Sequence, residues 1–278
     1  DSMAYCHDLN FDNNVPAGSQ LRCYQTLNLF GDLRGCPTMN IRNVSSGVVN
    51  AFGKNDTIQT NGGIMNVTLY LEVDADYEFI GNYNAPSYSI NSRNATSTIR
   101  SKSDTFFLQR IYPGRLFMDS TQVFFYGNNR WCLHDAGGTK TYTGTTTFHF
   151  QATTSTDINM RTLPNVIFYG NTNTIYYHTT IQGDITLLDN ANFSYSYYGG
   201  HATQSIINIT GSMAAYNGDM NLTAGKQYTF PSRTGSSLTI AGDLNAIGNC
   251  AEQINIQTNG YDSGIIPITV NGTANISY

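Results

Sequence analysis

The chain has few charged residues and no strong excess of either sign. Charged side chains make up 12% of its 278 residues, and the net charge is −5, whereas roughly 25% is typical of a globular protein. The 14 basic residues are scattered, although a nucleic-acid interface needs a basic patch or stripe. The sequence therefore predicts no nucleic-acid partner, and the same scatter argues against attraction to anionic lipid.

Long apolar runs are also missing. No stretch approaches the ~20 apolar residues that a membrane-spanning helix requires, so we expect no transmembrane segment. The start, Asp1–Cys6, lacks the charged opening and apolar core of a signal peptide. We therefore expect either a removed signal or a fragment of a longer chain. Residues 268–278, which stop within a β-like pattern, favour the fragment.

Cysteine is scarce, and its spacing excludes common metal motifs. The chain has five cysteines and no Cys-x-x-Cys pair, which argues against a zinc ribbon or a thioredoxin-like site. Cys6, Cys23 and Cys36 recur at intervals close to one coil of a repetitive β fold, so we expect them to stack on neighbouring coils and to pair. The odd count leaves at least one thiol free or paired outside the chain. Cys132 and Cys250 are interpreted as small buried side chains.

Helical periodicity is nearly missing as well, whereas β-strand patterns occur throughout. Short runs of alternating apolar residues are bounded by Gly, Asn, Asp or Pro, which form turns. The clearest runs are residues 64–73, 122–126, 165–169, 205–210 and 253–257. The pattern predicts an all-β protein.

A repeated phrase indicates how these strands are organised. Gly-Asp followed by an apolar residue opens a β-like run at Gly31, Gly183, Gly218 and Gly242. Repeated short strands at near-regular spacing are typical of a solenoid, in which each coil buries its apolar face on the next. Asn-Gly pairs, such as Asn61-Gly62, suit corners with positive φ.

Asparagine recurs inside the β-like runs, at Asn66, Asn208, Asn221 and Asn255. Strands normally exclude Asn, but stacked coils accept it where the amides hydrogen-bond in a ladder. The sequence therefore predicts a right-handed parallel β-helix. A β-sandwich is the alternative, because its strands recur at similarly short intervals. We expect a single domain over residues 1–278, with a decorated or irregular region at about 103–156.

Few residues point to catalysis. Glu72, Asp74 and Asp76 alternate, so an extended segment would project them to one face and raise at least one pKa; the alternative is a solvated strand end that leads into a turn. The Gly-Asp aspartates are expected at corners, where they bond backbone amides. Cys132, His134 and Asp135 are too close in sequence to face one another on a strand. We predict no catalytic residues, no metal site and no cofactor.

Tyrosine is abundant, with 19 residues, and it forms two clusters about a coil apart. Exposed tyrosine rows stack on sugar rings and hydrogen-bond through their hydroxyls, whereas buried rows form an aromatic core ladder. The sequence leaves both interpretations open for these residues. The candidate ligand contacts are Tyr176, Tyr177, Tyr195, Tyr197 and Tyr198.

The segment LTIAGDLNAIGNCAEQINI (residues 238–256) resembles a phrase of very large secreted β-solenoid surface proteins of Bacteroidota. Residues 8–11, followed by Pro16-Ala17-Gly18, are similar in style. The resemblance implies export by the type IX secretion system and a kinship with gliding-motility adhesins and surface filaments. Three sites fit the Bacteroidota O-glycosylation pattern of Asp, then Ser or Thr, then an apolar residue or Thr: Ser2, Thr57 and Ser120.

These observations predict a secreted or cell-surface protein without catalytic activity. We expect an adhesin-like or filament segment whose Tyr-, Asn- and Thr-rich surface attaches to glycans or to an external surface, with the secretion machinery as a further partner. One alternative is a carbohydrate-active β-helix enzyme or a tailspike-like polysaccharide-binding protein. Another is a purely structural stalk module.

Overall fold

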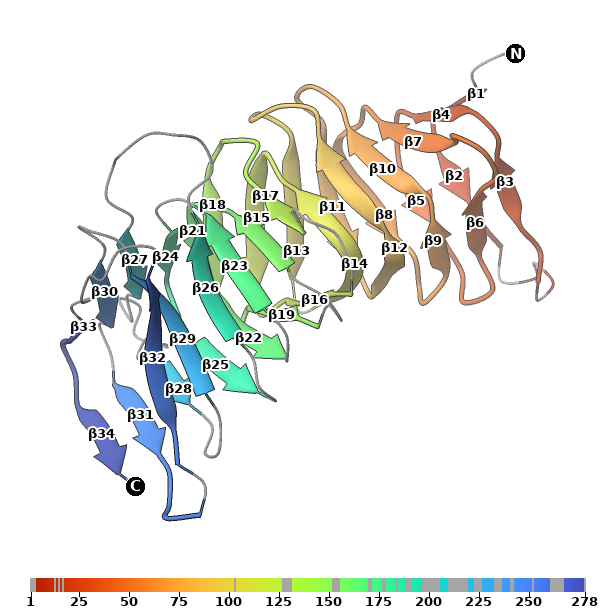
Figure 1. Ribbon diagram of the computed structural model, residues 1–278. Coiled ribbons are helices and arrows are strands. Elements are labelled where there is room, and N and C mark those ends of the chain that lie inside the picture. The colour runs from red at the N-terminus through yellow and green to blue at the C-terminus, as the bar shows by residue number, and fades with distance from the viewer. Residues whose placement is uncertain are drawn as a thin grey trace. The chain divides into compact units, whose positions relative to one another are not determined.

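A computed structural model gives the fold of the chain. It describes residues 4–12, 14, 16, 18–102, 104–126, 132–151, 156–169, 172–176, 179–183, 185–188, 192–196, 206–209, 220–222, 227–232, 237–240, 243–251, 253–260 and 268–277. The described residues form strands and no helix, and the strands pair in parallel (Figure 1). The prediction of an all-β parallel solenoid is confirmed.

Contacts within the chain group it into two compact units. Unit 1 comprises Asp1–Gly127 and His134–Thr146, and unit 2 comprises Asn128–Leu133 and Thr147–Tyr278. The boundary falls inside the region that the sequence marks as irregular, and the short strand β17 (Leu133–His134) lies on it. A single domain over residues 1–278 stays a prediction.

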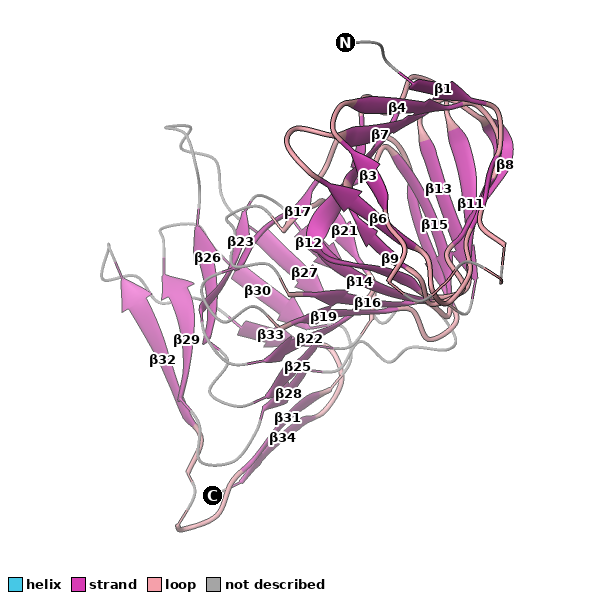
Figure 2. Cartoon of the chain, turned by 90° about the vertical axis from the view of Figure 1, so that its right-hand side faces the viewer, coloured by secondary structure: helices cyan, strands magenta, loops and turns pink. Residues whose placement is uncertain are grey.

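Unit 1 is built from three rows of stacked parallel strands (Figure 2). The first row is β1 (Ala4–Cys6), β4 (Thr26–Leu29), β7 (Val48–Ala51) and β10 (Thr68–Leu71). The second is β2 (Leu9–Asn10), β5 (Leu33–Arg34), β8 (Lys54–Gln59), β11 (Asp76–Ile80), β13 (Thr98–Lys102), β15 (Arg115–Asp119) and β18 (Lys140–Thr143). The third is β3 (Leu21–Cys23), β6 (Asn40–Asn43), β9 (Ile64–Asn66) and β16 (Gln122–Phe125).

Two longer strands, β12 (Tyr83–Ser92) and β14 (Thr105–Tyr112), run through both the third row and the first. Their pairing shifts register between Ala85 and Ser89, where the chain passes from one row to the other.

The core of unit 1 follows from strand alternation. In the first row Leu27, Val49, Leu69 and Ile90 are successive partners, and Val49, Leu69 and Ile90 are buried. Alternate residues of a strand point to opposite faces, so each coil places one apolar set inward. Three buried rings, Phe79, Tyr83 and Phe106, pack edge-on with centroids 5.3–5.9 Å apart. Corners take positive φ where expected, at Asn61 (51°) and Gly62 (84°).

Unit 2 stacks its strands in four groups. The first is β19 (Thr147–Phe150), β22 (Asn165–Tyr169), β25 (Ile185–Leu188), β28 (Met220–Leu222), β31 (Leu244–Ile247) and β34 (Ala274–Ser277). The second is β20 (Thr156–Asn159), β23 (Thr172–Tyr176) and β26 (Asn192–Ser196). The third is β21 (Thr162–Leu163), β24 (Thr179–Ile181), β27 (Ile206–Ile209), β30 (Ser237–Ile240) and β33 (Ile268–Val270), and the fourth is β29 (Gln227–Ser232) with β32 (Asn255–Gly260).

The Gly-Asp phrases of unit 2 fall in register with one another. Ile185, Met220 and Leu244, which follow three of the Gly-Asp pairs, are successive Cα partners in β25, β28 and β31. The intervals between these phrases in the sequence are therefore coil lengths. Each of these phrases therefore opens a strand at the same point of its coil.

Asn221, Asn245 and Asn275 are successive Cα partners in β28, β31 and β34, and the expected amide bond is described between the last two. The Asn275 Nδ2 donates a hydrogen bond to the Asn245 Oδ1 at 2.7 Å. The other asparagines named from the sequence have different partners: Asn66 lies beside Arg42, Asn208 beside Thr239 and Asn255 beside Gln227.

Candidate functional site

A groove crosses the outer face of the second row of unit 1, over β11, β13, β15 and β18. It encloses about 300 Å³. Alternation along these strands turns every second residue outward. Polar and charged side chains therefore surround one aromatic ring, that of Phe117. The lining residues are Glu78, Arg100, Ser101, Lys102, Phe117, Met118, Asp119, Thr141 and Thr143.

Strand register sets which outward residues are neighbours in the groove. Glu78, Arg100, Phe117 and Thr141 are successive Cα partners, and they make one line across the four strands. Further along the strands, Lys102, Asp119 and Thr143 make a second line. Partners on adjacent parallel strands lie about 4.8 Å apart. Phe117 is therefore flanked by a guanidinium on one side and by a threonine hydroxyl on the other.

The Phe117 ring has surroundings unlike those of most outward rings in unit 1. Phe107 and Phe124 stack on each other with centroids 5.4 Å apart, and Phe30 and Phe52 stack at 4.9 Å. In such a stack the faces of the rings contact each other, and the ring edges point to the surface. Within the described residues no ring stacks on Phe117, and no cation lies over it. Phe117 is half-buried and lines the groove without an aromatic partner among the described residues.

The charges of the groove are balanced, and they are only partly paired. Arg100 forms an ion pair with Asp76 outside the groove. Glu78 lies opposite Arg100, and Lys102 lies opposite Asp119, in register. Neither Glu78 nor Lys102 forms an ion pair with any described residue. Both groups can therefore bond a ligand without first breaking an ion pair.

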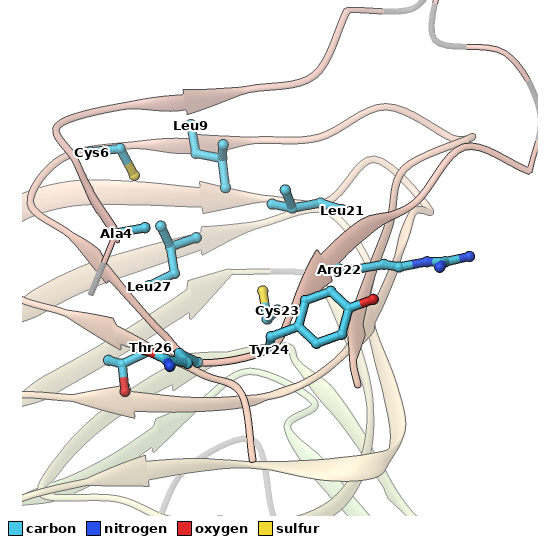
Figure 3. Close-up of a pocket in the computed structure, with 10 residues that line it drawn as sticks. Ala4, Cys6, Leu9, Leu21, Arg22, Cys23, Tyr24, Thr26 and Leu27 are labelled. Atoms are coloured by element: carbon cyan, nitrogen blue, oxygen red, sulfur yellow. The ribbon is translucent and has the colours of Figure 1, made fainter. Parts of the chain in front are cut away.

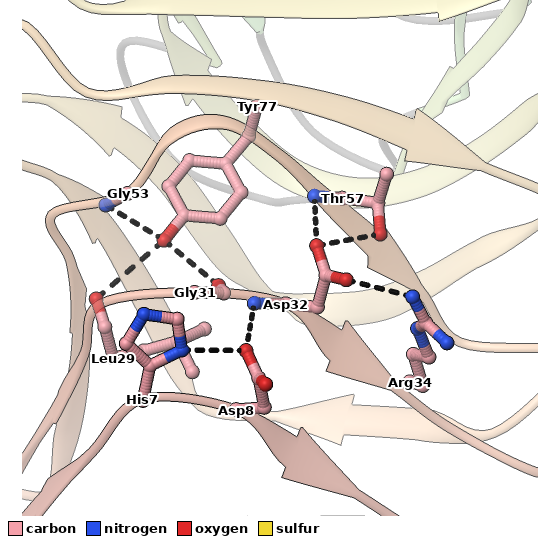
Figure 4. Close-up of polar contacts among 9 residues, drawn as sticks. All are labelled: His7, Asp8, Leu29, Gly31, Asp32, Arg34, Gly53, Thr57 and Tyr77. Atoms are coloured by element: carbon pink, nitrogen blue, oxygen red, sulfur yellow. Dashed lines mark hydrogen bonds and ion pairs between the residues drawn. The ribbon is translucent and has the colours of Figure 1, made fainter.

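Two of the four Gly-Asp aspartates, Asp32 and Asp243, bond backbone amides of the next coil, as the sequence predicts, and Asp184 and Asp219 lie outside the described residues. Asp8 Oδ1 accepts a hydrogen bond from the Asp32 backbone N at 3.0 Å, and Asp32 Oδ1 accepts one from the Thr57 backbone N at 2.8 Å (Figure 4). The Thr57 amide holds the pKa of the Asp32 carboxyl below its ordinary value. Asp243 plays the same part in unit 2, where it accepts from the Thr273 N at 2.6 Å.

A buried tyrosine strengthens the same corner from within. The Tyr77 hydroxyl accepts a hydrogen bond from the Gly53 N at 2.9 Å and donates to the Gly31 carbonyl at 3.2 Å (Figure 4). Burial raises the pKa of Tyr77 well above its ordinary value. A side chain at Gly53 would collide with this hydroxyl, so the close approach requires glycine.

The three clustered carboxylates lie at a strand end that leads into a turn, which is the alternative to a shared acidic face. Glu72 follows the end of β10, Asp74 has φ 60° in the turn, and Asp76 begins β11. The chain bends between two rows at this point. Glu72 forms an ion pair with Arg93 at 3.3 Å, and Asp76 forms one with Arg100.

The expected disulfide among Cys6, Cys23 and Cys36 is not formed, and all three are free thiols. The spacing that suggested stacking is shorter than the coil. Cys6 lies beside Leu29 in the first row, so Cys23 falls in a different row. Cys6 and Cys23 do line one apolar hollow of about 380 Å³ in the first coil (Figure 3), and burial raises the pKa of both thiols.

Two of the three O-glycosylation candidates are described by the structure, and the hydroxyl of each donates a hydrogen bond. The Thr57 Oγ1 donates to Asp32 Oδ1 at 3.0 Å, and the Ser120 Oγ donates to Asp119 Oδ1 at 3.2 Å. Both residues are half-buried. Ser2 lies outside the described residues, and glycosylation at all three sites stays a prediction.

The tyrosine candidates lie in unit 2. Tyr176 ends β23, and Tyr195 lies in β26 beside Ile175. The side chains of both, and the whole of Tyr177, Tyr197 and Tyr198, lie outside what the structure describes. Their role in ligand binding stays a prediction.

The residues of the groove were not singled out from the sequence. A signal was present, because charged or aromatic residues alternate with apolar ones in 76–80, 98–102 and 115–119. Alternation alone shows that these side chains leave the core. It does not show that three strands bring them side by side, which depends on register.

Searches of protein-family models, of curated proteins and of solved structures found no match to this chain. Within the described ranges, no helix has the length and apolarity needed to cross a membrane. The same residues contain no cluster of three or more His, Cys, Asp or Glu side chains able to hold a metal ion.

Proposed function

We propose that this chain is a non-catalytic, glycan-binding segment of a surface β-solenoid, and that the groove around Phe117 is its binding site. The observation that carries the proposal is the unstacked Phe117 ring among balanced polar groups. Sugars offer an apolar C–H face and a rim of hydroxyls, and an aromatic ring with polar neighbours complements both.

Each wall of the groove has a part in this proposal. The pyranose face packs on Phe117, and the carboxylates of Glu78 and Asp119 accept hydrogen bonds from vicinal hydroxyls. Lys102 and Arg100 donate to ring and hydroxyl oxygens. Hydrogen bonds to charged groups are the stronger ones, so a few of them suffice to orient one sugar in an open groove.

The direction of the bound chain follows from the sheet. Strands in the row are spaced by about 4.8 Å, which is close to the rise of one pyranose in an extended β-linked glycan. A glycan that runs across the strands would therefore meet one outward side chain per sugar. Because the groove carries two cations and two anions, we expect a neutral glycan, whose binding depends weakly on salt.

The carboxylate geometry favours binding over hydrolysis. Glu78 and Asp119 are two strands apart and offset along the strand direction, which separates their Cα atoms by about 12 Å on ideal strand spacing. Hydrolysis by a carboxylate pair needs the two carboxyl groups on opposite sides of one glycosidic bond. Phe117 and the β13 side chains lie between these two, so we assign them to binding.

The secreted or cell-surface location, the adhesin-like role and export by the type IX route are part of the same proposal. They are supported by the resemblance of residues 238–256 and by the low charge of the chain. A stiff solenoid with a glycan groove on one face suits attachment to an external surface.

Glycan-array screening, followed by affinity electrophoresis with neutral, uronate-containing and amino polysaccharides, tests the proposal. We expect binding to a neutral polysaccharide and a roughly 10- to 100-fold loss in Phe117→Ala, because a packed ring contributes about 1.5–3 kcal/mol. Phe124→Ala, which removes a stacked ring outside the groove, is the matched control. Binding that persists in Phe117→Ala, or release of reducing ends from the polysaccharide, would contradict it.

A further inference from the structure

We propose that Lys140 is a positioning residue for this groove: its buried ammonium fastens together the two loops that lead into β15 and β18. The inference rests on the proposed function, because it concerns the same groove. It assigns a role to a residue that neither lines the groove nor contacts its ligand.

The ammonium of Lys140 is enclosed by acceptors. Its Nζ donates to the carbonyls of Gly114 at 2.6 Å, Gly137 at 2.5 Å and Gly138 at 3.2 Å, and to Asp135 Oδ1 at 2.8 Å. The side chain is only 3% exposed. A buried charge is tolerated only when it is paired and hydrogen-bonded, and this arrangement meets both conditions.

These acceptors come from two separate loops. Gly114 directly precedes Arg115, the first residue of β15, and Gly137 and Gly138 precede Lys140, the first residue of β18. Gly138 has φ +77° and lies against the Gly114 carbonyl, which brings the loops into contact. Asp135 Oδ1 also accepts from the Gly137 N at 2.7 Å, so the carboxylate holds the loop and the ammonium at once.

Lys140 occupies an inward position of its strand, where neighbouring residues are apolar and buried. It is the partner of the fully buried Leu116, and Tyr142, the next inward residue of β18, is buried too. Thr141 and Thr143 between and beyond them face outward into the groove. The same strand start therefore fixes the inward lysine and the outward wall of the site.

The consequence is a fixed distance between Phe117 on β15 and Thr141 on β18, which are Cα partners. Backbone hydrogen bonds from Ala136 N to the Pro113 carbonyl and from Leu116 N to the Thr139 carbonyl also join these loops. The ammonium adds the only charged link between them among the described residues, so its loss loosens the start of the last strand of the groove. Binding sites lose affinity when their support allows displacements of about 1 Å.

The test compares Lys140→Met with Asp32→Ala, and it uses the neutral polysaccharide that binds the wild-type chain best. Asp32→Ala removes a corner hydrogen bond in the same unit, away from the groove, and so controls for a general loss of stability. Affinity is measured at a temperature at which circular dichroism shows both variants folded. We expect about tenfold weaker binding in Lys140→Met and unchanged affinity in Asp32→Ala.

Asp135→Asn provides a second variant that keeps the lysine and most of its hydrogen bonds, in case Lys140→Met does not fold. We expect its affinity to fall by about threefold, because one charged acceptor becomes neutral. Wild-type affinity in Asp135→Asn and Lys140→Met, or an equal loss in Asp32→Ala, would overturn the positioning role while the glycan groove stands. A wild-type chain that binds no polysaccharide would overturn both.

Discussion

The two units use the same stacking rule with different coil lengths. Among the described pairings of unit 1, the shortest step along the chain joins Ile99 to Leu116, and the longest, which joins Leu33 to Ile58, is only moderately longer. In unit 2 the range is wider, because Thr156 pairs with Asn173 whereas Ile185 pairs with the far more distant Met220. The inward apolar residues still meet in both units, so segments between strands absorb the variation in length.

Corner side chains fasten neighbouring coils in both units. Asp32 accepts a hydrogen bond from the Thr57 N in unit 1, and Asp243 accepts one from the Thr273 N in unit 2. In the described part of unit 2, side chains on neighbouring strands also bond each other, as Asn275 bonds Asn245 and His149 bonds the Tyr169 hydroxyl at 3.1 Å. Core stacking therefore carries the fold in both, and the fastenings are local additions.

The largest expected effect comes from removing a buried ring in each unit. Phe79→Ala in unit 1 and Phe168→Ala in unit 2 each leave a cavity at a fully buried site, and we expect each to lower the free energy of unfolding by about 3–5 kcal/mol. Amide hydrogen exchange should show the loss of protection mainly in the unit that carries the substitution, because a coil contacts only its neighbours.

Tyr24→Ala, which removes an exposed side chain, is the control for this pair. Equal loss of protection in both units from either substitution would contradict the comparison, since it would mean that the chain unfolds as one cooperative body.

A pH-dependent effect of intermediate size is expected from His149. Burial lowers its pKa to about 4, so between about pH 6.5 and pH 4 the unfolded chain binds a proton that the folded chain does not. Stability therefore falls as the pH falls through this window, by roughly 2–3 kcal/mol. Urea denaturation at several pH values should show the fall in wild type, and a reduced fall in His149→Phe.

His134 in unit 1 also has a pKa lowered by burial, so some dependence should remain in His149→Phe. An unchanged profile in that variant would mean that the pKa of His149 is the same in the folded and unfolded chain.

The smallest expected effect concerns the corner bonds of unit 1. Asp32→Ala should lower the free energy of unfolding by about 1 kcal/mol at neutral pH, which is the typical net contribution of one hydrogen bond. Because the folded pKa of Asp32 is lowered, its contribution is present above about pH 4 and is lost at lower pH. Thermal melts between neutral and acidic pH check this.

Asp32→Asn separates the bond from the charge at this corner. Its amide oxygen still accepts from Thr57, so stability at neutral pH should stay close to wild type and should depend less on acid. A melt for Asp32→Asn as low as that for Asp32→Ala would show that the charge, and not the bond, matters.

Several features were predictable because they repeat at the level of single strands. Alternation at 64–73 indicated β9 and β10, and the Gly-Asp phrases indicated the partners Ile185, Met220 and Leu244. Asp32 was predictable as a corner residue, since its bond to the next coil follows from a turn. At 72–76 the sequence left open a shared acidic face or a strand end that leads into a turn, and the positive φ at Asp74 gives the turn.

The all-β class, the preference for stacked parallel coils and the structural part of Asp32 and Asp243 could be predicted, because strand alternation and turn chemistry are local properties of the chain. Which residues meet across coils was established by the fold. The register that sets β13, β15 and β18 side by side places Phe117 in the groove. The same register places Lys140 where it joins the two loops that lead into β15 and β18. Register depends on the lengths of all the segments between the paired strands, so it cannot be predicted from the pattern of any one strand.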